Sequence, residues 1–250
     1  MITIKSEREI ELMRKAGMLV SEMHKFIKPY IKEGITTKEL DKLCEDFILS
    51  NDAVPSCKGY NGFPATLCTS VNDTVVHGIP SNYKLKDGDI ITIDVVIGYK
   101  GYQGDAAWTY KVGEVDSDKE YLMEHTEKAL YEGLKQAIPG NRIGDISNAI
   151  EEYAEEHNLG VVRELCGHGI GKDMHEDPEV PNFGTKNTGP RLKPGMVICI
   201  EPMLTFGERY VYVEDDDWTV KTEDSSPAAH FEHTVLITED GNEVLTPRLD

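Results

Sequence analysis

The stretch that decides the fold is LKDGDIITID at residues 85–94, and it recurs as LKPGMVICIE at residues 192–201. Each copy has a glycine turn, then a run of β-branched and apolar residues, then a carboxylate where another apolar residue would be expected. A carboxylate in such a strand is costly to bury unless it is paired or bound to a cation. The repeat therefore predicts two strands that bring Asp94 and Glu201 to one shared centre, and metal binding is the leading reason for placing them there.

The residues that follow Asp94 predict a β-hairpin. The segment 98–101 has the composition of a turn, and a turn centred between Tyr99 and Lys100 places Asp94 directly opposite Asp105 on one face. Cross-strand neighbours have Cβ atoms about 5 Å apart, and two like charges there are destabilising unless a cation lies between them. The alternative is two solvated acids on an open strand, which the many isoleucines and valines of 90–96 disfavour.

The second half offers further candidate ligands. Glu232 lies in a strand-like run at 228–238, and His168 stands among three glycines in CGHGIG at 166–171. With Asp94, Asp105 and Glu201, these residues form an oxygen-rich set with one nitrogen and no thiolate. That set has too many carboxylates for a single tetrahedral zinc and suits two ions that share bridging carboxylates. The sequence thus predicts a dinuclear hydrolytic site.

Seven short stretches, in order and with compatible spacing, also carry a family resemblance. They are residues 68–80, 93–94, 104–105, 167–171, 174–176, 200–203 and 231–234. These stretches carry a resemblance to the bacterial type I methionine aminopeptidases, which are metallopeptidases of the pita-bread fold. The resemblance extends over essentially the whole length of the chain. The type II form is disfavoured, because no long insertion separates His175 from Glu201 or Glu201 from Glu232.

The resemblance implies a function and a set of roles. The activity would be removal of the initiator methionine from nascent polypeptides, with a small second residue preferred. Two divalent ions (Mn, Fe, Co or similar, the one used in the cell being undetermined) would supply a metal-bridged hydroxide that attacks the scissile carbonyl. The implied metal ligands are Asp94, Asp105, His168, Glu201 and Glu232.

The resemblance also assigns catalytic and substrate-binding residues. Glu201 would act as base and then acid, His175 would hydrogen-bond the carbonyl oxygen, and His77 would contact the amide nitrogen. His77 and His175 would also bind substrate. The remaining implied pocket residues are Tyr60, Phe63, Cys68 and Trp218, where Phe63 stands at a position that is often Tyr in relatives.

The predicted fold class is α+β: a pseudo-two-fold, curved, largely antiparallel sheet covered on one side by two pairs of helices, with the metals on the other. Capping boxes predict helix starts at Ser6, Thr36 and Ser117, and Asp145 begins a fourth helix. We expect a single domain over 1–250, made of two related halves at about 1–112 and 113–250.

Composition limits the partners. The formal net charge of −19 disfavours direct nucleic-acid binding, and no run has the length of a membrane span. Five cysteines without a C-x-x-C motif, and a charged N-terminal segment unlike a signal peptide, predict the cytoplasm. We expect a monomer that acts on N-terminal Met peptides and nascent chains, with transient ribosome contact.

Several residues and alternative functions stay outside this assignment. His24, His125 and His157 are expected at the surface or at helix ends, His233 should face away from Glu232, and a hydrogen bond from His230 to the site is left open. Residues 215–217, three consecutive aspartates, are expected to form a solvated loop. The rival functions are a dipeptidase or prolidase, and a non-catalytic binding protein on the same fold.

Overall fold

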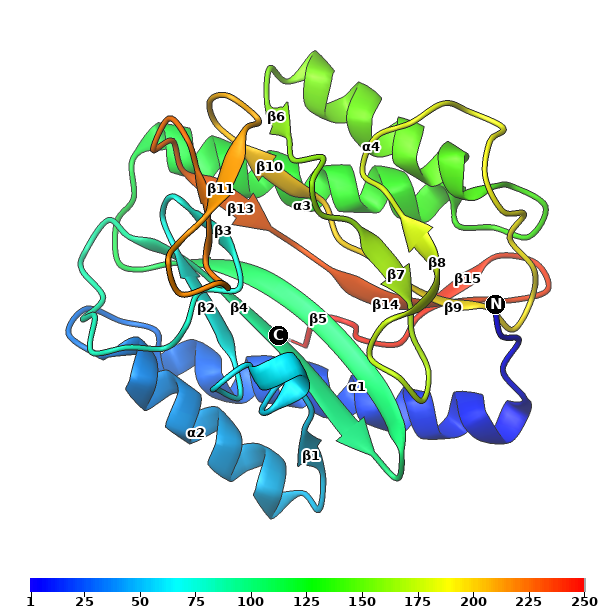
Figure 1. Ribbon diagram of the computed structural model, residues 1–250, viewed down its shortest axis with the longest axis horizontal. Coiled ribbons are helices and arrows are strands. Elements are labelled where there is room, and N and C mark those ends of the chain that lie inside the picture. Colours follow the sequence, from blue (N-terminus) through cyan, green and yellow to red (C-terminus); the bar gives the residue numbers. More distant parts are fainter. Residues whose placement is uncertain (250) are drawn as a thin grey trace.

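The computed structural model, which describes residues 1–249, has two pairs of helices with the strands between them in the view of Figure 1, and residues of both pairs belong to one hydrophobic core cluster. The helices are α1 (Glu7–Ile27), α2 (Thr37–Ser50), α3 (Ser117–Gln136) and α4 (Ile143–Glu156), with short 3₁₀ turns at η1 (Lys28–Tyr30) and η2 (Tyr60–Gly62). No helix within 1–249 is long and apolar enough to cross a membrane.

Within residues 1–249 the strands pair antiparallel throughout and form four sheets, with the orders β1-β4-β2 (β5 also on β4), β13-β10-β6, β11-β12-β3 and β15-β14-β9-β7-β8. Their bounds are β1 (Val54–Pro55), β2 (Cys68–Val71), β3 (Thr74–Val76), β4 (Ile90–Tyr99), β5 (Tyr102–Lys111), β6 (Gly160–Val161), β7 (Gly167–Gly169), β8 (Glu176–Val180), β9 (Val197–Ile200), β10 (Met203–Thr205), β11 (Val211–Val213), β12 (Val220–Thr222), β13 (Ala228–His230), β14 (His233–Ile237) and β15 (Asn242–Val244). The predicted α+β class is confirmed, and the repeated stretches form β4 and β9.

The β4–β5 hairpin differs from its predicted register. Tyr99 pairs with Tyr102, so the turn consists of Lys100 and Gly101, whose φ angles of 48° and 84° fit the left-handed requirement of a type I′ turn. Asp94 therefore pairs with Ala107, and Asp105 pairs with Val96. The error is two residues, which preserves the face of every side chain. The two aspartates are diagonal neighbours on one face rather than direct partners.

The helix starts were predicted well where a capping box is present. Glu9 accepts the Ser6 N–H at 2.8 Å, and Glu39 accepts the Thr36 N–H at 2.8 Å. The third start was one residue late, because the side chain of Asp116 accepts the Lys119 N–H at 2.9 Å and is the N-cap. The fourth predicted start, at Asp145, was wrong: the helix begins two residues earlier, at Ile143, and Asp145 accepts the Arg142 N–H from within the first turn at 2.7 Å.

The predicted strand at 228–238 is in fact two strands with a break at Phe231 and Glu232. The chain changes partners there, since β13 pairs with β10 and β14 pairs with β9. Within the break, the Glu232 N–H donates to the Ala107 carbonyl of β5 at 2.8 Å. The break thus leaves Glu232 outside a regular ladder but beside the first-half hairpin.

His24 is buried rather than at the surface. Its Nδ1 lies 2.9 Å from the Tyr110 hydroxyl, its Nε2 lies 3.2 Å from the Ala106 carbonyl, and its ring stacks on Trp108 at 4.0 Å. Burial lowers the pKa of this imidazole to about 3. His24 is therefore a neutral structural link between α1 and β5. His157 caps the end of α4, as expected, and its ring lies 4.2 Å from that of His125.

Helix α1 crosses β5 at a contact that only glycine allows. A Cβ at Gly104 would lie 2.6 Å from the Gly17 nitrogen and 2.8 Å from the Gly17 Cα. Gly17 in turn faces the Leu245 carbonyl, which would be 2.3 Å from an added Cβ. This approach brings α1 directly behind the strand that carries Asp105.

We therefore expect Gly104→Ala to lower the free energy of unfolding by about 2 kcal/mol, as overpacking of a rigid backbone contact does. The matched control is Gly241→Ala, because a Cβ there would meet only Thr238 Oγ1, at 3.9 Å. Urea unfolding of the two variants checks the prediction. Equal stability of both would show that α1 and β5 can separate without cost.

Candidate metal centre

A cavity of about 300 Å³ contains every residue that the sequence assigned to the site. It is lined by His77, His175, Tyr60, Phe63, Cys68, Trp218, Asp94, Asp105, His168, Glu201 and Glu232, together with Cys57, Asn61, Val76, Val96, Leu165, Cys166, Met174, Met203 and His230. Residues that are distant in sequence thus meet in a single hollow.

The candidate metal ligands come from both halves of the chain. Asp94 projects from β4 and Asp105 from β5, while His168 lies in β7, Glu201 directly follows β9, and Glu232 occupies the break before β14. The His168 Nε2 atom is 3.4 Å from Glu201 Oε1 and 3.8 Å from Asp105 Oδ2. One ligand atom from each of Asp105, His168 and Glu232 fits within a mutual distance of 4.8 Å.

The electrostatics of these groups favour a bound cation. Burial, and then the charges of Glu232 and Asp94, raise the pKa of Asp105 well above its ordinary value. Burial, and then Asp94, do the same to the pKa of Glu201. Burial and Glu201 likewise raise the pKa of Glu232. Without a counter-charge, these carboxyls cannot all ionise at neutral pH.

The His168 imidazole is neutral and has a free Nε2 lone pair, as a nitrogen ligand requires. Its Nδ1 donates to the Gly169 carbonyl at 2.9 Å, so the Nε2 lone pair points toward the carboxylates. Burial, and then His175, lower the pKa of His168 to about 4. An unprotonated imidazole held by a backbone carbonyl is the usual form of a ligating histidine.

Two buried carboxylate oxygens lack the kind of partner that a metal ion would provide. Asp105 Oδ1 and Glu232 Oε1 are buried and have no hydrogen-bond partner among the described residues. An orphaned oxygen of this kind is costly, and a divalent cation with oxygen ligands would satisfy both atoms. The donor set therefore fits a divalent metal.

Two threonines join β5 to the segment 230–234 and hold this donor set in register. The Thr234 hydroxyl donates to the Asp105 carbonyl at 2.7 Å and accepts the Asp105 N–H at 3.0 Å. The Thr109 hydroxyl likewise donates to the His230 carbonyl at 2.9 Å and accepts the His230 N–H at 3.0 Å. We call this contact the seam. It fixes the backbone of Asp105 relative to that of Glu232.

One side of the cavity is lined by aromatic rings. The Tyr60 hydroxyl lies 2.8 Å from His175 Nδ1, and Phe63 meets Trp218 edge to face at 5.1 Å. His77 follows β3 with a φ of 58°, a conformation that costs energy for a residue other than glycine. It turns its ring toward Trp218, at 6.4 Å between centroids.

The aspartates at 215–217 form an exposed loop, as expected, and Asp216 also accepts hydrogen bonds from the backbone that follows it. Its Oδ1 accepts the N–H groups of Trp218 at 2.9 Å and Thr219 at 2.7 Å. These bonds orient the backbone that carries the Trp218 ring into the cavity.

Sequence reasoning missed Cys199. Its sulfur lies within the same 4.8 Å group as Asp105, His168 and Glu232, although the sequence predicted a set without sulfur. Burial, and then the neighbouring carboxylates, raise the pKa of the thiol well above its ordinary value, as burial also does for the pKa of Asp105 and of Glu232. Its position two residues before Glu201 on a strand was the available signal, because such residues share a face.

His230 enters the cavity, but without the hydrogen bond that the sequence left open. It is fully buried, both ring nitrogens lack a partner among the described residues, and Nε2 is 3.6 Å from Glu201 Oε2. The nearest carboxylate is thus Glu201 rather than Glu232. His233 faces away, as expected, toward Thr246 at 3.1 Å.

The fold and this donor set together define a divalent-metal hydrolase site, and comparison with known proteins agrees. Residues 11–239 match the model of metallopeptidase family M24. The chain belongs to this family, so it is an enzyme, and the resemblance drawn from its sequence is confirmed.

Individual relatives match nearly the full length of the chain. It is 53% identical to "Methionine aminopeptidase 1" of Bacillus subtilis, over 98% of this chain and 99% of that protein. The crystal structure of methionine aminopeptidase from Rickettsia prowazekii superposes with a TM-score of 0.98 at 43% identity, covering 99% of this chain and 100% of the other. A prolidase from Pyrococcus horikoshii shares the fold alone, with a TM-score of 0.80 at 24% identity over 98% of this chain and 64% of the prolidase.

If the seam holds the donor set together, Thr234→Val should weaken binding of Mn²⁺ by about 10-fold or more, the range seen when an outer partner of a ligand is lost. Valine keeps the shape but leaves the Asp105 N–H and carbonyl unpaired. The control is Thr234→Ser, which retains the hydroxyl. Isothermal titration calorimetry measures both, and an unchanged Kd in the valine variant would contradict the role of the seam.

Proposed function

We propose that this enzyme removes the N-terminal methionine from polypeptides whose second residue is small. The observation that carries the proposal is the placement of a buried, oxygen-rich donor set in the same cavity as an aromatic slot. The relatives named methionine aminopeptidase support the substrate. Nascent chains would be the natural source of such N-termini.

We propose two divalent ions, of Mn, Fe, Co or a similar metal, held by Asp94, Asp105, His168, Glu201 and Glu232. Four ionised carboxylates are balanced by two divalent ions and not by one. The raised pKa values of Asp105 and Glu232 support this, because the groups need nearby positive charge in order to ionise. When bound, such ions act as Lewis acids that lower the pKa of a water molecule so that it can attack a carbonyl at neutral pH.

The protein's own residues would carry the remaining steps. Glu201 would accept a proton from the attacking water and pass it to the leaving amine. His175 would donate from Nε2 to the carbonyl oxygen as negative charge develops, since its Nδ1 is engaged by the Tyr60 hydroxyl at 2.8 Å. His77 would contact the amide nitrogen beyond the scissile bond, from the strained backbone position that turns its ring into the cavity.

The methionine side chain would occupy the slot formed by Tyr60, Phe63, Cys68, His77 and Trp218. Phe63 and Cys68 pack with Met174 in one buried cluster, and Trp218 lies against it. A thioether suits such a lining, because sulfur–aromatic contacts contribute up to about 1.5 kcal/mol. Phe63, in place of a tyrosine, makes this wall apolar.

We further propose that residues 1–250 act as one domain of two related halves, and that the enzyme is a cytoplasmic monomer with transient contact to the ribosome. The seam between β5 and 230–234 supports a single unit, because the metal-ligating residues lie on both of its sides. The five free cysteines support a reducing compartment.

The first experiment compares Met-Ala-Ser with an Ala-Pro peptide in the presence of Mn²⁺. We expect release of methionine from the first peptide only, and a loss of at least 100-fold in kcat/KM for Asp105→Ala, because this variant would lose one of the carboxylates proposed to hold the metal. Cleavage of Ala-Pro instead would favour a prolidase, and no cleavage of either would favour a binding protein. An Asp105→Ala enzyme with more than a tenth of the normal activity would refute the metal assignment.

A second experiment tests the slot. Trp218→Ala and Tyr60→Ala should each raise KM for methionyl peptides and reduce the preference for Met over Leu, because both remove the aromatic lining. Tyr212→Ala is the matched control, since Tyr212 is an exposed aromatic of β11 that does not line the cavity. An unchanged preference in both slot variants would mean that the slot is wrongly placed.

A further inference from the structure

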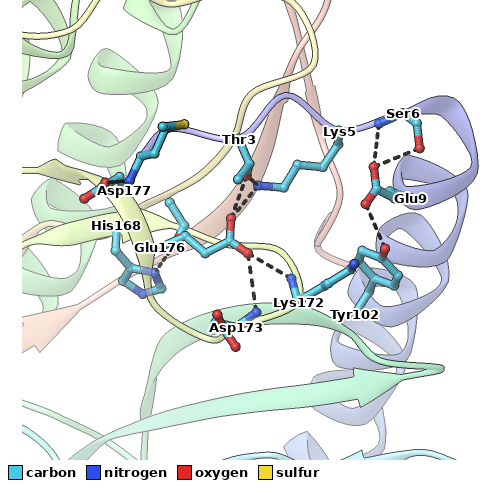
Figure 2. Close-up of polar contacts among 12 residues, drawn as sticks. Thr3, Lys5, Ser6, Glu9, Tyr102, His168, Lys172, Asp173, Glu176 and Asp177 are labelled. Carbon is cyan, nitrogen blue, oxygen red and sulfur yellow. Dashed lines mark hydrogen bonds and ion pairs between the residues drawn. The ribbon is translucent and has the colours of Figure 1, made fainter.

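The loop at 171–176 presents two side chains to the cavity, Met174 and His175, and the next side chain, Glu176, closes this loop on itself. Glu176 Oε1 accepts the N–H groups of Lys172 at 2.9 Å and of Asp173 at 3.4 Å (Figure 2). The shape of the loop therefore depends on where the Glu176 carboxylate is held.

The other oxygen of this carboxylate is held by the N-terminal segment 1–5, which we call the strap. Glu176 Oε2 accepts from the Thr3 hydroxyl at 2.7 Å and from Lys5 Nζ at 2.7 Å, and Figure 2 shows both side chains reaching it from the same side. The ion pair is sheltered, with only 5% of the Lys5 side chain and 13% of the Glu176 side chain exposed.

Two glycines make room for the strap. A Cβ at Gly171 would lie 2.4 Å from Glu176 Oε1 and 2.7 Å from Lys5 Cε. A Cβ at Gly195 would lie 2.7 Å from Ile4 Cγ2, and its carbonyl accepts the Lys5 N–H at 2.8 Å. Gly171 belongs to the glycine-rich motif around His168, and Gly195 to the turn before β9, so both motifs also accommodate the strap.

The opposite end of the loop is attached to β5. The Gln103 N–H donates to the Gly171 carbonyl at 2.9 Å, and Gln103 Nε2 donates to the Lys172 carbonyl at 3.1 Å. His175 thus lies in a loop whose first residues are held by β5 and whose last residue, Glu176, is held by the strap. Its Nδ1 lies 2.8 Å from the Tyr60 hydroxyl, and its ring meets that of His168 edge to face, at 4.3 Å between centroids.

We propose that Lys5, assisted by Thr3, is a positioning residue for His175, an inference that rests on the role given to His175 in the proposed function. A sheltered carboxylate that loses its cation is left uncompensated and turns toward water. Glu176 would then release the Lys172 and Asp173 N–H groups, and the loop would carry His175 away from the reacting carbonyl. A misplacement of about 1 Å at a catalytic group can cost up to about 100-fold in rate.

The test uses Lys5→Met, which keeps the length of the side chain and removes its charge. We expect kcat for Met-Ala-Ser to fall about 10-fold with KM changed less than about threefold, because His175 acts mainly in the transition state. Arg14→Met is the matched control. It breaks the pair between α1 and Glu243, at 2.7 Å, which does not touch the loop, so kcat should stay normal.

A double-mutant cycle separates positioning from general stabilisation. In a His175→Ala background, Lys5→Met should change kcat less than about twofold, because the residue through which it acts is absent. An equal fall in both backgrounds would overturn the proposal. Should Lys5→Met fold poorly, Thr3→Val removes one hydrogen bond to Glu176 and should give a smaller loss of kcat with the same dependence on His175.

A measurement that does not depend on catalysis separates the positioning role of Lys5 from the proposed aminopeptidase activity. The ring Cε1–H resonance of His175, assigned by its loss in His175→Ala, should shift or broaden in Lys5→Met, while that of the buried His24 should not. An unmoved His175 resonance would refute positioning even in an active enzyme. Failure of the wild type to release methionine would refute the proposed function, and the resonance would still decide whether the strap holds His175.

Discussion

The burial of several like-charged carboxylates in one small space is the constraint on which the rest of the structure depends. Asp105 and Glu232 are almost fully buried, with oxygens that no group of the described chain satisfies. Such an arrangement is stable only if the backbone beneath it is rigid and a cation completes it. The surrounding elements serve to provide that rigidity.

The seam is the central support. A continuous backbone ladder between β5 and 230–234 would keep Glu232 within a regular strand, but the chain breaks at Phe231 and Glu232 in order to change sheets. On either side of the break, threonine hydroxyls join this segment to β5 through the backbone groups of Asp105 and His230. The Asp105 backbone is thereby tied to the second half while the Glu232 side chain remains directed at the cavity.

Close backbone contacts add the remaining rigidity. Gly104 lets α1 lie against the strand that bears Asp105, and Gly171 lets the strap reach the loop of His175. His77 accepts a strained φ and directs its ring to the cavity. The strained φ of His77 is a local energetic cost at a residue that lines the cavity, and such strain is commonly found at functional sites.

The sequence by itself determined the helix starts at Ser6 and Thr36, the two repeated strands and the α+β class. These follow from local rules, because capping boxes and alternating burial act over a few neighbouring residues. Carboxylates within apolar strands also indicated the metal-ligand set, whereas a family resemblance, and no local rule, indicated His77, His175 and the other pocket residues that line the cavity.

Only the tertiary structure decided the hairpin register, the break at Phe231 and Glu232, the approach of His230 to Glu201, and the pairing of Lys5 with Glu176. The register depended on the dihedral angles of Lys100 and Gly101, which a plausible turn composition does not distinguish from an adjacent turn. The other features join residues far apart in sequence. Such contacts leave no periodic signal, since they depend on how complete elements pack against one another.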